Sequence, residues 1–257
     1  MSVITFLSDF GTTDHYVASV KARIVSQKSD QVIVDLSHDI RPFDIAHAST
    51  VLRQVYSDFP KRTVHLVAVD SMRQKSQPIA LEMDGHYFVG FNSGLFSLIA
   101  KEKPGMVVSL DGEASVFPAK EVLGPAAVHL ASGKSLAEVG TPFEAYTELY
   151  PRQLKVTKRE IAGNVVSVDH YGNLITNIQK EDFEKILSIN GNGTRHLIRF
   201  GREAFEKVHT YYTEVESGDC FVMFNSLGFL QIGINKGNAS ELLGLRVDAP
   251  VIIEFNH

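Results

Sequence analysis

The sequence predicts two domains of unlike architecture: an α/β N-terminal domain with a mainly parallel sheet, and a smaller C-terminal antiparallel β-barrel or sandwich. Three observations support this fold class. Short apolar runs alternate with helical segments in the first half, the pattern breaks near residues 141–160, and closely spaced strands follow. Alternating strands and helices are typical of a parallel sheet covered by helices, whereas regularly spaced short strands are typical of small barrels and sandwiches. We therefore expect domains at 1–145 and 161–257, joined by a linker at 146–160.

The elements of the first domain follow from apolar runs and helical spacing. Short runs rich in β-branched residues predict buried strands at 3–7, 31–36, 63–70 and 106–111. An Asp84-Gly85 turn predicts a hairpin with strands near 79–83 and 86–91. Helices are expected after Asp14, from Asp44, and over 121–133, where Gly133 ends the last one.

The second domain is predicted to consist mainly of short strands separated by turns. We expect these strands at 163–169, 172–178, 196–201, 209–215, 219–225, 229–235 and 249–255. Only two segments, 180–188 and 239–244, have helical character here. Because the two domains differ in architecture, a cleft between them is the natural place for a ligand.

The composition limits the function classes. The chain has 257 residues, is 44% hydrophobic and 21% charged, and carries a formal net charge of −5. The absence of a dense Lys/Arg block argues against nucleic acid or an anionic membrane as the main partner. Cys220 is the only cysteine, so neither a disulfide framework nor a thiolate metal cluster is expected. Without a signal core or a long apolar run, we expect a cytoplasmic protein.

Carboxylates stand at the ends of the predicted parallel strands, where α/β sheets bind ligands. Asp9, Asp35 and Asp70 end the first three strands. Asp9 can accept two hydrogen bonds from a ribose diol, although bonds to N–H groups of its own turn are nearly as plausible. Asp14 opens the first helix and is interpreted as its N-cap.

A metal site is a competing hypothesis for the same region. Hard or borderline ligands are available as in a two-metal hydrolase: Asp9, His15, Asp35, His38, Asp39 and Asp70. No tight ligand motif such as H-E-x-x-H accompanies them. His15 and His38 are therefore interpreted as solvated loop residues, and His129 as a packing residue of an apolar helix.

Six segments together resemble one protein family. They are FLSDFGTTDHYVASVKARI, VDLSHDIRPFDIAHAS, FNSGL, GPAAVHLASG, VDHYGNLITNI and FNSLGFLQIGINKGNAS. In this order they resemble the S-adenosyl-L-methionine hydroxide adenosyltransferase family, whose relatives include fluorinase and chlorinase. The resemblance runs across nearly the whole chain. It implies an α/β N-terminal domain, a β-barrel C-terminal domain, and a homotrimer whose ligand lies between neighbouring subunits.

The resemblance also implies roles for individual residues toward S-adenosylmethionine, which would be a substrate rather than a cofactor. Asp9 would accept hydrogen bonds from the ribose hydroxyls, and Asp14 would support that turn or the methionine end. Asp169 would receive the methionine amino group, which is a charge-assisted contact. Further contacts are expected from Tyr171 to adenosine and from Asn173 to adenine or its surroundings. Ser226 would contact the methionine carboxylate, and the backbone at Asn238 and Ala239 would contact the adenine edge. Phe43 and Tyr211 would add aromatic walls, although each equally suits core packing. Phe117 matches a residue of a family segment and is also assigned to substrate binding.

The family reaction is an in-line substitution at the ribose 5′ carbon, and the chain departs from the pattern of its hydrolytic members. Those members resemble one another in an Asp, Arg and His set. Asp70 matches the Asp, but Ser76 and Gln77 occupy the positions of the Arg, and Pro118 stands where the His would be. Arg73 is a nearby cation that would substitute only if the loop folds differently. Halogenase activity is disfavoured, because a negative Asp70 would repel a halide.

Three hypotheses about function follow. The first is hydrolysis of S-adenosylmethionine to adenosine and methionine, with Asp70 orienting or deprotonating water and Arg73 as an electrostatic helper. The second is a non-catalytic protein that binds S-adenosylmethionine or adenosine and has lost the hydrolytic Arg and His. The third is a metal-dependent hydrolase. Under the first two hypotheses we expect no metal and no other cofactor.

Overall fold

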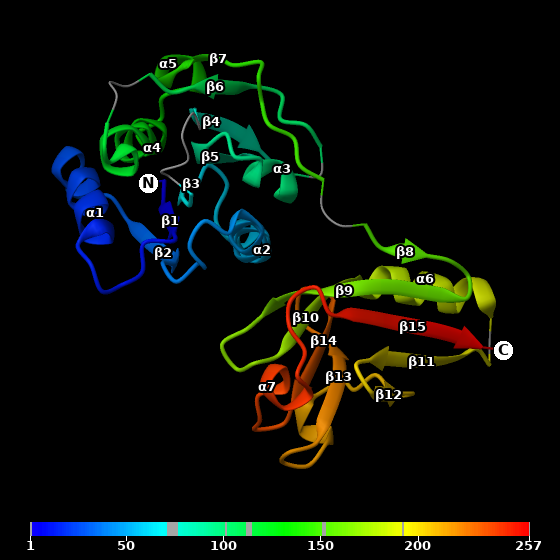
Figure 1. Cartoon of the computed structure of the whole chain (residues 1–257). Helices are drawn as coiled ribbons and strands as arrows, with labels where there is room; N and C mark the ends of the chain where they lie inside the picture. Colours follow the sequence, from blue (N-terminus) through cyan, green and yellow to red (C-terminus); the bar gives the residue numbers. More distant parts are fainter. Residues whose placement is uncertain are drawn as a thin grey trace. The chain divides into compact units, whose positions relative to one another are not determined.

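The chain forms two compact units, Met1–Pro151 and Arg152–His257, each with its own sheet and core (Figure 1). The structure is a computed structural model and describes residues 2–70, 77–100, 102–111, 115–150, 153–191 and 193–256. The first unit is a mixed sheet with helices, and the second is an antiparallel, barrel-like sheet. The predicted fold class is therefore confirmed.

The first sheet has a parallel half and an antiparallel half. Its strands, in spatial order, are β2 (Ile33–Ser37), β1 (Ile4–Ser8), β3 (Val64–Ala68), β5 (His86–Phe91), β4 (Pro78–Met83), β6 (Val107–Ser109) and β7 (Thr141–Pro142). β2, β1, β3 and β5 are parallel, whereas β4, β6 and β7 pair antiparallel. The parallel half brings the carboxyl ends of β1, β2 and β3 to one edge, and the candidate site begins there.

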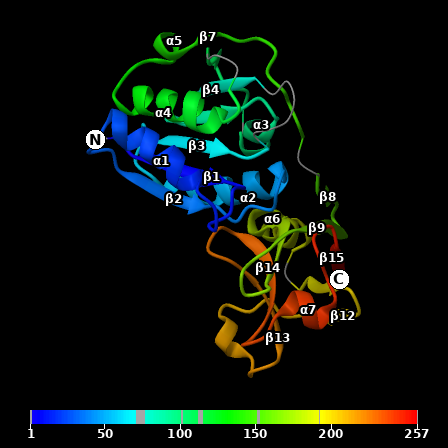
Figure 2. The same cartoon turned by 60° about the vertical axis from the view of Figure 1, so that its left-hand side comes forward.

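Helices cover both faces of this sheet (Figures 1 and 2). α1 (Tyr16–Gln27) and α4 (Gly124–Ala131) share one core cluster, and α2 (Ile45–Val55) and α3 (Leu95–Ile99) share another. Side chains alternate along β1, so that Phe6 belongs to the first cluster and Leu7 to the second. Two short elements, η1 (Tyr56–Asp58) and α5 (Leu136–Val139), complete the unit together with the π segment described next.

The helix expected over 121–133 starts as a π-helical turn, η2 (Ala119–Leu123), and continues as α4. Gly124 donates its N–H to the carbonyl of Ala119, five residues back. Pro125 follows and has no N–H for the carbonyl of Glu121, so a regular α-helical ladder cannot run through this point. After α4, Gly133 adopts φ +100° and ends the helix, as predicted.

The segment after β7 is bound to the first unit over residues 143–149. The Asn92 side chain donates to the carbonyl of Ala145 at 2.9 Å and accepts the N–H of Thr147 at 2.7 Å. Ser97 Oγ accepts the N–H of Leu149 at 2.8 Å. Gly94 has φ +90°, and a Cβ there would lie 2.5 Å from the Leu149 side chain, so this close approach requires glycine.

The second unit is antiparallel throughout its described strands. Its sheet runs β12 (Glu203–Phe205), β11 (Arg195–Phe200), β15 (Pro250–Asn256), β9 (Glu160–Val168), β10 (Leu174–Gln179), β14 (Phe229–Ile234) and β13 (Cys220–Phe224), with β8 (Lys155–Val156) paired to β9. β9 pairs with β15 over its first half and with β10 over its second half. α6 (Lys180–Asn190) and α7 (Ala239–Leu243) are its helices. One core cluster, which includes Ile161, Leu230 and Ile253, lies inside.

The strand predicted at 209–215 is wrong. Only His209 forms a bridge, to Met223, and residues Tyr212–Glu214 form a 3-10 turn, η3. The Glu214 carboxylate accepts the N–H groups of Thr210 and Tyr211 at 2.7 and 3.0 Å. These local side-chain bonds compete with strand pairing, and the β-branched and aromatic composition of the segment did not reveal them.

Candidate functional site

The centre of the candidate site is a carboxylate that joins three loops at the ends of parallel strands. Asp9 follows β1, and its Oδ2 accepts the backbone N–H of Phe43 at 2.9 Å and of Asp70 at 3.1 Å. Phe43 lies in the loop after β2, and Asp70 lies just beyond β3. The structure thus brings together Asp9, Phe43 and Asp70, and it shows Asp9 bonding N–H groups of neighbouring loops. Its predicted contact with ribose stays a prediction.

Phe43 and Asp70 share an unusual backbone conformation. Phe43 has φ +65° and Asp70 has φ +53°, in the left-handed region that non-glycine residues seldom adopt. Such conformations persist where the surrounding structure holds them in place, and they cluster at ligand sites. Phe43 is also 67% exposed, so its ring is presented to solvent and does not pack in the core.

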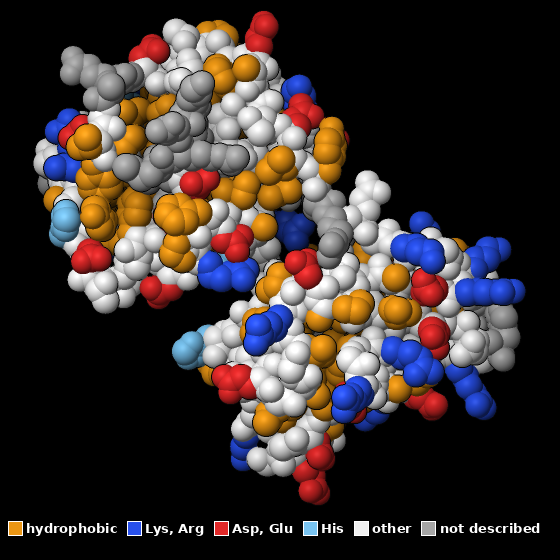
Figure 3. All heavy atoms as spheres, in the orientation of Figure 1, with side chains coloured by type: hydrophobic (Ala, Val, Ile, Leu, Met, Phe, Trp, Pro, Cys, Tyr) orange, Lys and Arg blue, Asp and Glu red, His pale blue; other side chains and the backbone are white. Residues whose placement is uncertain are grey.

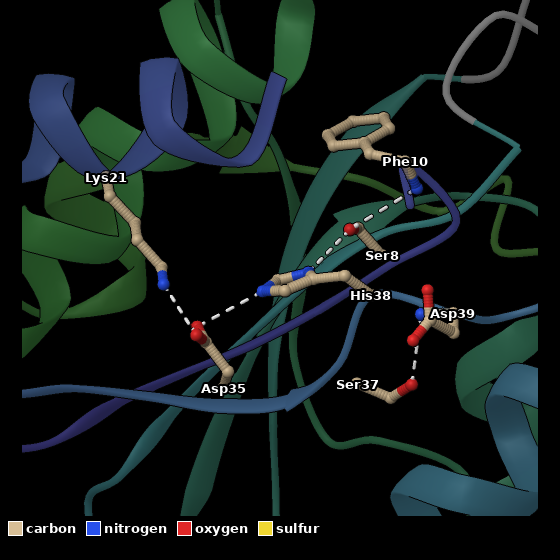
Figure 4. Close-up of polar contacts among 7 residues, drawn as sticks. All are labelled: Ser8, Phe10, Lys21, Asp35, Ser37, His38 and Asp39. Atoms are coloured by element: carbon tan, nitrogen blue, oxygen red, sulfur yellow. Dashed lines mark hydrogen bonds and ion pairs between the residues drawn. The ribbon is translucent and has the colours of Figure 1, made fainter. Parts of the chain in front are cut away.

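A chain of polar contacts supports the loop that carries Asp9 (Figure 4). Ser8 Oγ lies 2.7 Å from Nδ1 of His38, Asp35 Oδ1 lies 3.1 Å from Nε2 of His38, and Lys21 Nζ lies 2.5 Å from Asp35 Oδ2. The Nε2 contact has ion-pair distance without hydrogen-bond geometry. His38 also accepts the N–H of Gly11 through its carbonyl at 2.8 Å. Its side chain and backbone therefore both hold the turn after β1.

The interpretation of His38 as a solvated loop residue was wrong, because His38 is only 7% exposed. Strand pairing explains why. β1 and β2 are neighbours with Leu7 opposite Ser37, so Ser8 and His38 emerge side by side. The adjacency of two parallel strands ending in Ser8 and in Ser37-His38 is the signal that would have found this pair. His15, by contrast, is exposed and stacks on Tyr16 at 4.5 Å, and His129 is exposed on α4 and does not pack in the core.

Three aromatic rings form a cluster that contains Phe10, the residue that follows Asp9. Phe10 contacts Tyr16 and Phe117, with ring centroids 5.8 Å apart in both pairs, and Tyr16 meets Phe117 at 5.6 Å. Phe117 is partly buried against the core cluster below α1 and α4. Phe117 therefore joins the group around Asp9 through Phe10, in a position that suits an aromatic wall.

Several predicted residues of the first unit lie apart from this group or outside the described residues. The N-cap of α1 is His15, without a side-chain cap bond, and Asp14 is exposed. The N-cap interpretation of Asp14 was therefore wrong, because the helix begins only at Tyr16. Arg73 and Ser76 fall in 71–76, outside the described residues. Gln77 directs its amide at the carbonyls of Pro78 and Leu110, both at 3.4 Å.

Pro118 is the N-cap of the π segment, and Ala119 is fully buried. The backbone here is tightly held, since the carbonyl of Phe117 accepts the N–H groups of Lys120 and Glu121, both at 3.1 Å. Pro118 contributes no side-chain donor at the position that resembles the hydrolytic His. The acidic side chains in the described part of this site are therefore Asp9 and Asp70, which follow β1 and β3.

In the second unit, the turn between β9 and β10 is organised by Asp169. Its Oδ1 accepts the N–H groups of Tyr171 and Asn173, both at 2.9 Å, and its Oδ2 accepts Nδ2 of Asn173 at 2.9 Å. Such bonds from an Asp side chain to the N–H groups that follow it are typical of a tight turn between paired strands. Tyr171 is 76% exposed at the tip, where its ring is available to a ligand.

The start of α7 packs against this turn. Asn238 caps α7 by accepting the N–H of Glu241 at 3.1 Å. Gly172 has φ +82°, and a Cβ there would lie 1.9 Å from Asn238 Oδ1, so only glycine permits this contact. Ser240 N–H also bonds the carbonyl of Gly172 at 2.9 Å. Asp169, Tyr171, Asn173, Asn238 and Ala239 thus form one group, in which Ala239 is fully buried.

Ser226 does not join that group. It is exposed in the turn between β13 and β14. Gln179 at the far end of β10 pairs with Phe229, whereas Leu174 beside the turn 169–173 pairs with Ile232. Ser226 therefore lies at the opposite end of the β10–β14 pair. Tyr211 is the N-cap of η3 and is 66% exposed, so it does not pack in the core.

The described residues offer neither a metal cluster nor a membrane helix. Across 2–70, 77–100, 102–111, 115–150, 153–191 and 193–256, no group of three or more His, Cys, Asp or Glu side chains could hold a metal ion. Asp35 and His38, two members of the metal hypothesis, are instead bound to Lys21, to Ser8 and to each other. No helix in the same ranges has the length and apolar character needed to cross a bilayer.

Comparison with known proteins places both units in the same family. Residues 4–140 match the SAM hydroxide adenosyltransferase N-terminal domain, and residues 163–252 match the C-terminal domain. The chain is 31% identical to a protein named (R)-S-adenosyl-L-methionine hydrolase from Methanocaldococcus jannaschii, over 95% of this chain and 93% of the relative. It is 29% identical to a protein of the same name from Thermus thermophilus, over 98% and 99% of the two chains.

More distant relatives and solved structures agree. A protein named fluorinase from an Actinoplanes species is 26% identical over 98% of this chain and 97% of its own. A solved structure of a conserved protein from Thermotoga maritima superposes with a TM-score of 0.87 at 30% identity, covering 98% of this chain and 99% of that one. The chain therefore belongs to the SAM hydroxide adenosyltransferase family.

Proposed function

We propose that this protein hydrolyses S-adenosylmethionine to adenosine and methionine. The observation that carries the proposal is the position of Asp70, a carboxylate whose backbone is fixed at the carboxyl end of β3 by Asp9. Full-length relatives named (R)-S-adenosyl-L-methionine hydrolase, 24–31% identical to the chain, support the same reaction. Their printed name leads us to propose the (R) epimer at sulfur as the preferred substrate.

The reaction requires little acid-base catalysis from the protein. Water oxygen forms a bond to the ribose 5′ carbon, the bond from that carbon to sulfur breaks, and the electron pair goes to sulfur. Methionine leaves as a neutral thioether, so no general acid is needed, and one proton of the attacking water is released. Asp70 accepts this proton or orients the water, and the surrounding site aligns the oxygen opposite sulfur and excludes other water.

Substrate binding is assigned to the two groups of side chains described above. In the first unit, Asp9 meets the ribose, while Phe43 and Phe117 provide aromatic surfaces. In the second unit, Tyr171 and Asn173 contact adenosine and Asp169 receives the methionine ammonium. Asp169 Oδ2 carries one bond, from Asn173, and a carboxylate oxygen can accept another. Asp14, Tyr211, Ser226, Asn238 and Ala239 keep their predicted contacts only as proposals.

The proposal is tested by following adenosine release from purified protein. Asp70→Asn should lower the rate by about 100-fold or more, because the variant keeps the side-chain shape but cannot take up the proton. Both sulfonium epimers are incubated in the presence of a chelator, and products are separated by chromatography. Arg73→Ala is measured in parallel to test whether that cation assists the attacking oxygen.

The outcomes separate the alternatives. If the protein binds S-adenosylmethionine in calorimetry but releases no adenosine above the spontaneous rate, the non-catalytic binding hypothesis replaces this one. Activity that disappears with the chelator and returns with a divalent ion would favour the metal-dependent hydrolase. Unchanged activity in Arg73→Ala would remove Arg73 from the mechanism and leave the role of Asp70 intact.

We also propose a homotrimer in which a ligand site is completed by a neighbouring subunit. The resemblance described above motivates this assembly. The surface near Asp9 suits a partner, since Tyr16, Phe43 and Val116 are 42%, 67% and 90% exposed, and apolar side chains also gather on the face of the first unit seen in Figure 3. On the visible face of the second unit, Lys and Arg side chains are interspersed with acidic ones (Figure 3).

A further inference from the structure

Asp9 is placed so that its two carboxylate oxygens have different surroundings. Oδ2 accepts two backbone N–H groups, from Phe43 and from Asp70. Within the part of the chain that the structure describes, Oδ1 accepts no hydrogen bond. Two donors from separate loops therefore converge on one oxygen, and that oxygen links the ends of three neighbouring parallel strands, β1, β2 and β3.

Both donors belong to residues whose conformation needs support. Phe43 and Asp70 are non-glycine residues with φ +65° and +53°. The backbone N–H of each donates to the same oxygen of the Asp9 carboxylate. Bonds from N–H groups to an ionised oxygen are stronger than bonds between neutral groups. The bond to Asp70 therefore holds the backbone from which the proposed catalytic carboxylate projects.

We propose that Asp9 is a positioning residue, whose Oδ2 fixes Asp70 and Phe43 while Oδ1 remains for the substrate. This inference rests on the proposed hydrolysis and assigns Asp9 a second task besides its expected ribose contact. If Asp9 only contacted the ribose, its substitution would change substrate affinity and leave the rate at saturating substrate unaltered. A positioning residue also affects the rate at saturating substrate, because a displacement of about 1 Å at a reacting group costs roughly 100-fold.

Two substitutions at Asp9 separate these tasks. Asp9→Asn keeps one oxygen with two lone pairs, so the amide can still accept both N–H groups, but the second oxygen becomes a donor. Asp9→Ala removes the acceptor altogether. We expect Asp9→Asn to raise KM while kcat stays within about tenfold, and Asp9→Ala to lower kcat by about 100-fold at saturating S-adenosylmethionine. Asp30→Ala, which removes an exposed carboxylate between α1 and β2, is the matched control and should change neither parameter.

A second measurement does not depend on activity. Amide hydrogen exchange reports whether the N–H groups of Phe43 and Asp70 keep their acceptor. Exchange at both positions should accelerate in full-length Asp9→Ala and remain close to the wild type in Asp9→Asn and Asp30→Ala. If exchange there is unchanged in Asp9→Ala, or if that variant raises KM with an unaltered kcat, the positioning role is wrong. If the wild type releases no adenosine, the proposed function fails while the exchange measurement still decides whether Asp9 holds the two loops.

Discussion

The side-chain contacts that link Lys21, Asp35, His38 and Ser8 favour one position for the ring proton of the buried His38. Burial raises the pKa of the Asp35 carboxyl, but Lys21 and His38 outweigh it, so the pKa lies below its usual value. An ionised Asp35 has only acceptor atoms, and its Oδ1 lies 3.1 Å from Nε2 of His38, so its charge favours a proton on that nitrogen. With the proton on Nε2, Nδ1 is left to accept the Ser8 hydroxyl at 2.7 Å, and Ser8 Oγ in turn faces the Phe10 N–H at 3.5 Å.

This arrangement predicts the cost of removing one partner. His38→Phe should lower the free energy of unfolding by about 1–3 kcal/mol, because the fully buried Ser8 hydroxyl loses its acceptor. Urea unfolding at neutral pH measures the change. Ser8→Ala in the His38→Phe background should cost little more, since no stranded hydroxyl remains. A double variant whose loss equals the sum of the two single losses would contradict the coupling.

For single residues, the sequence predicted the position in the fold better than the hydrogen-bond partners of the side chain. Asp9 and Asp70 could be placed because each follows an apolar run, and a parallel sheet gathers such ends at one edge. The bond from Asp9 to the backbone of Asp70 could not be predicted, because it depends on the left-handed turn at Asp70. Asp14 shows the opposite error, since a cap-type residue before a helix need not be the residue at which the helix begins.

The central strands also carry a buried pair of histidines at the end of the sheet away from the candidate site. His65 Nδ1 lies 2.8 Å from Thr5 Oγ1, and His65 Nε2 lies 3.3 Å from His86 Nδ1. Both rings are fully buried, and Tyr56 meets both edge-on. Burial, assisted by the neighbouring His86, lowers the pKa of His65 to about 3.

This pair predicts acid sensitivity. Between the ordinary His pKa of about 6.5 and the folded pKa of about 3, the unfolded chain binds a proton that the folded chain does not. The free energy of unfolding should therefore fall as pH decreases through this window, by up to about 1.4 kcal/mol per pH unit from this group. His65→Gln should show a shallower decrease in urea unfolding from pH 7 to pH 4. Equal slopes for the two proteins would show that His65 is not responsible.

Long periodic elements were predictable, and short ones were not. The 12-residue α1 and the hairpin around Asp84-Gly85 follow directly from spacing and turn chemistry. α3 and α5 have only five and four residues, too few for a helical period to show. The strand prediction for 209–215 failed for another reason. The Glu214 carboxylate accepts local N–H groups that a strand would have paired with a neighbouring strand.

At the scale of the whole molecule, the candidate substrate contacts are divided between two units that fold around separate cores. Asp9 and Asp70 belong to the first unit, and Asp169, Tyr171 and Asn173 belong to the second. The two groups can meet within one subunit or between subunits. The family resemblance implies the second arrangement, in which each subunit gives one half-site to each neighbour, as a closed ring of heterologous contacts requires.

Complementation between two damaged subunits tests this arrangement. Asp70→Asn disables the half of the site that the first unit provides. Tyr171→Asp places a charge in the half that the second unit provides, and because Tyr171 is 76% exposed, the substitution should not disturb folding. Each variant alone should be nearly inactive. In a trimer with sites between subunits, co-expression of the two should restore about a quarter of the wild-type adenosine release, because random assembly brings two intact halves together at about one site in four. Light scattering should give a trimer for every sample. A mixture that remains as inactive as its components, or a fully active monomer, would place the complete site within one subunit.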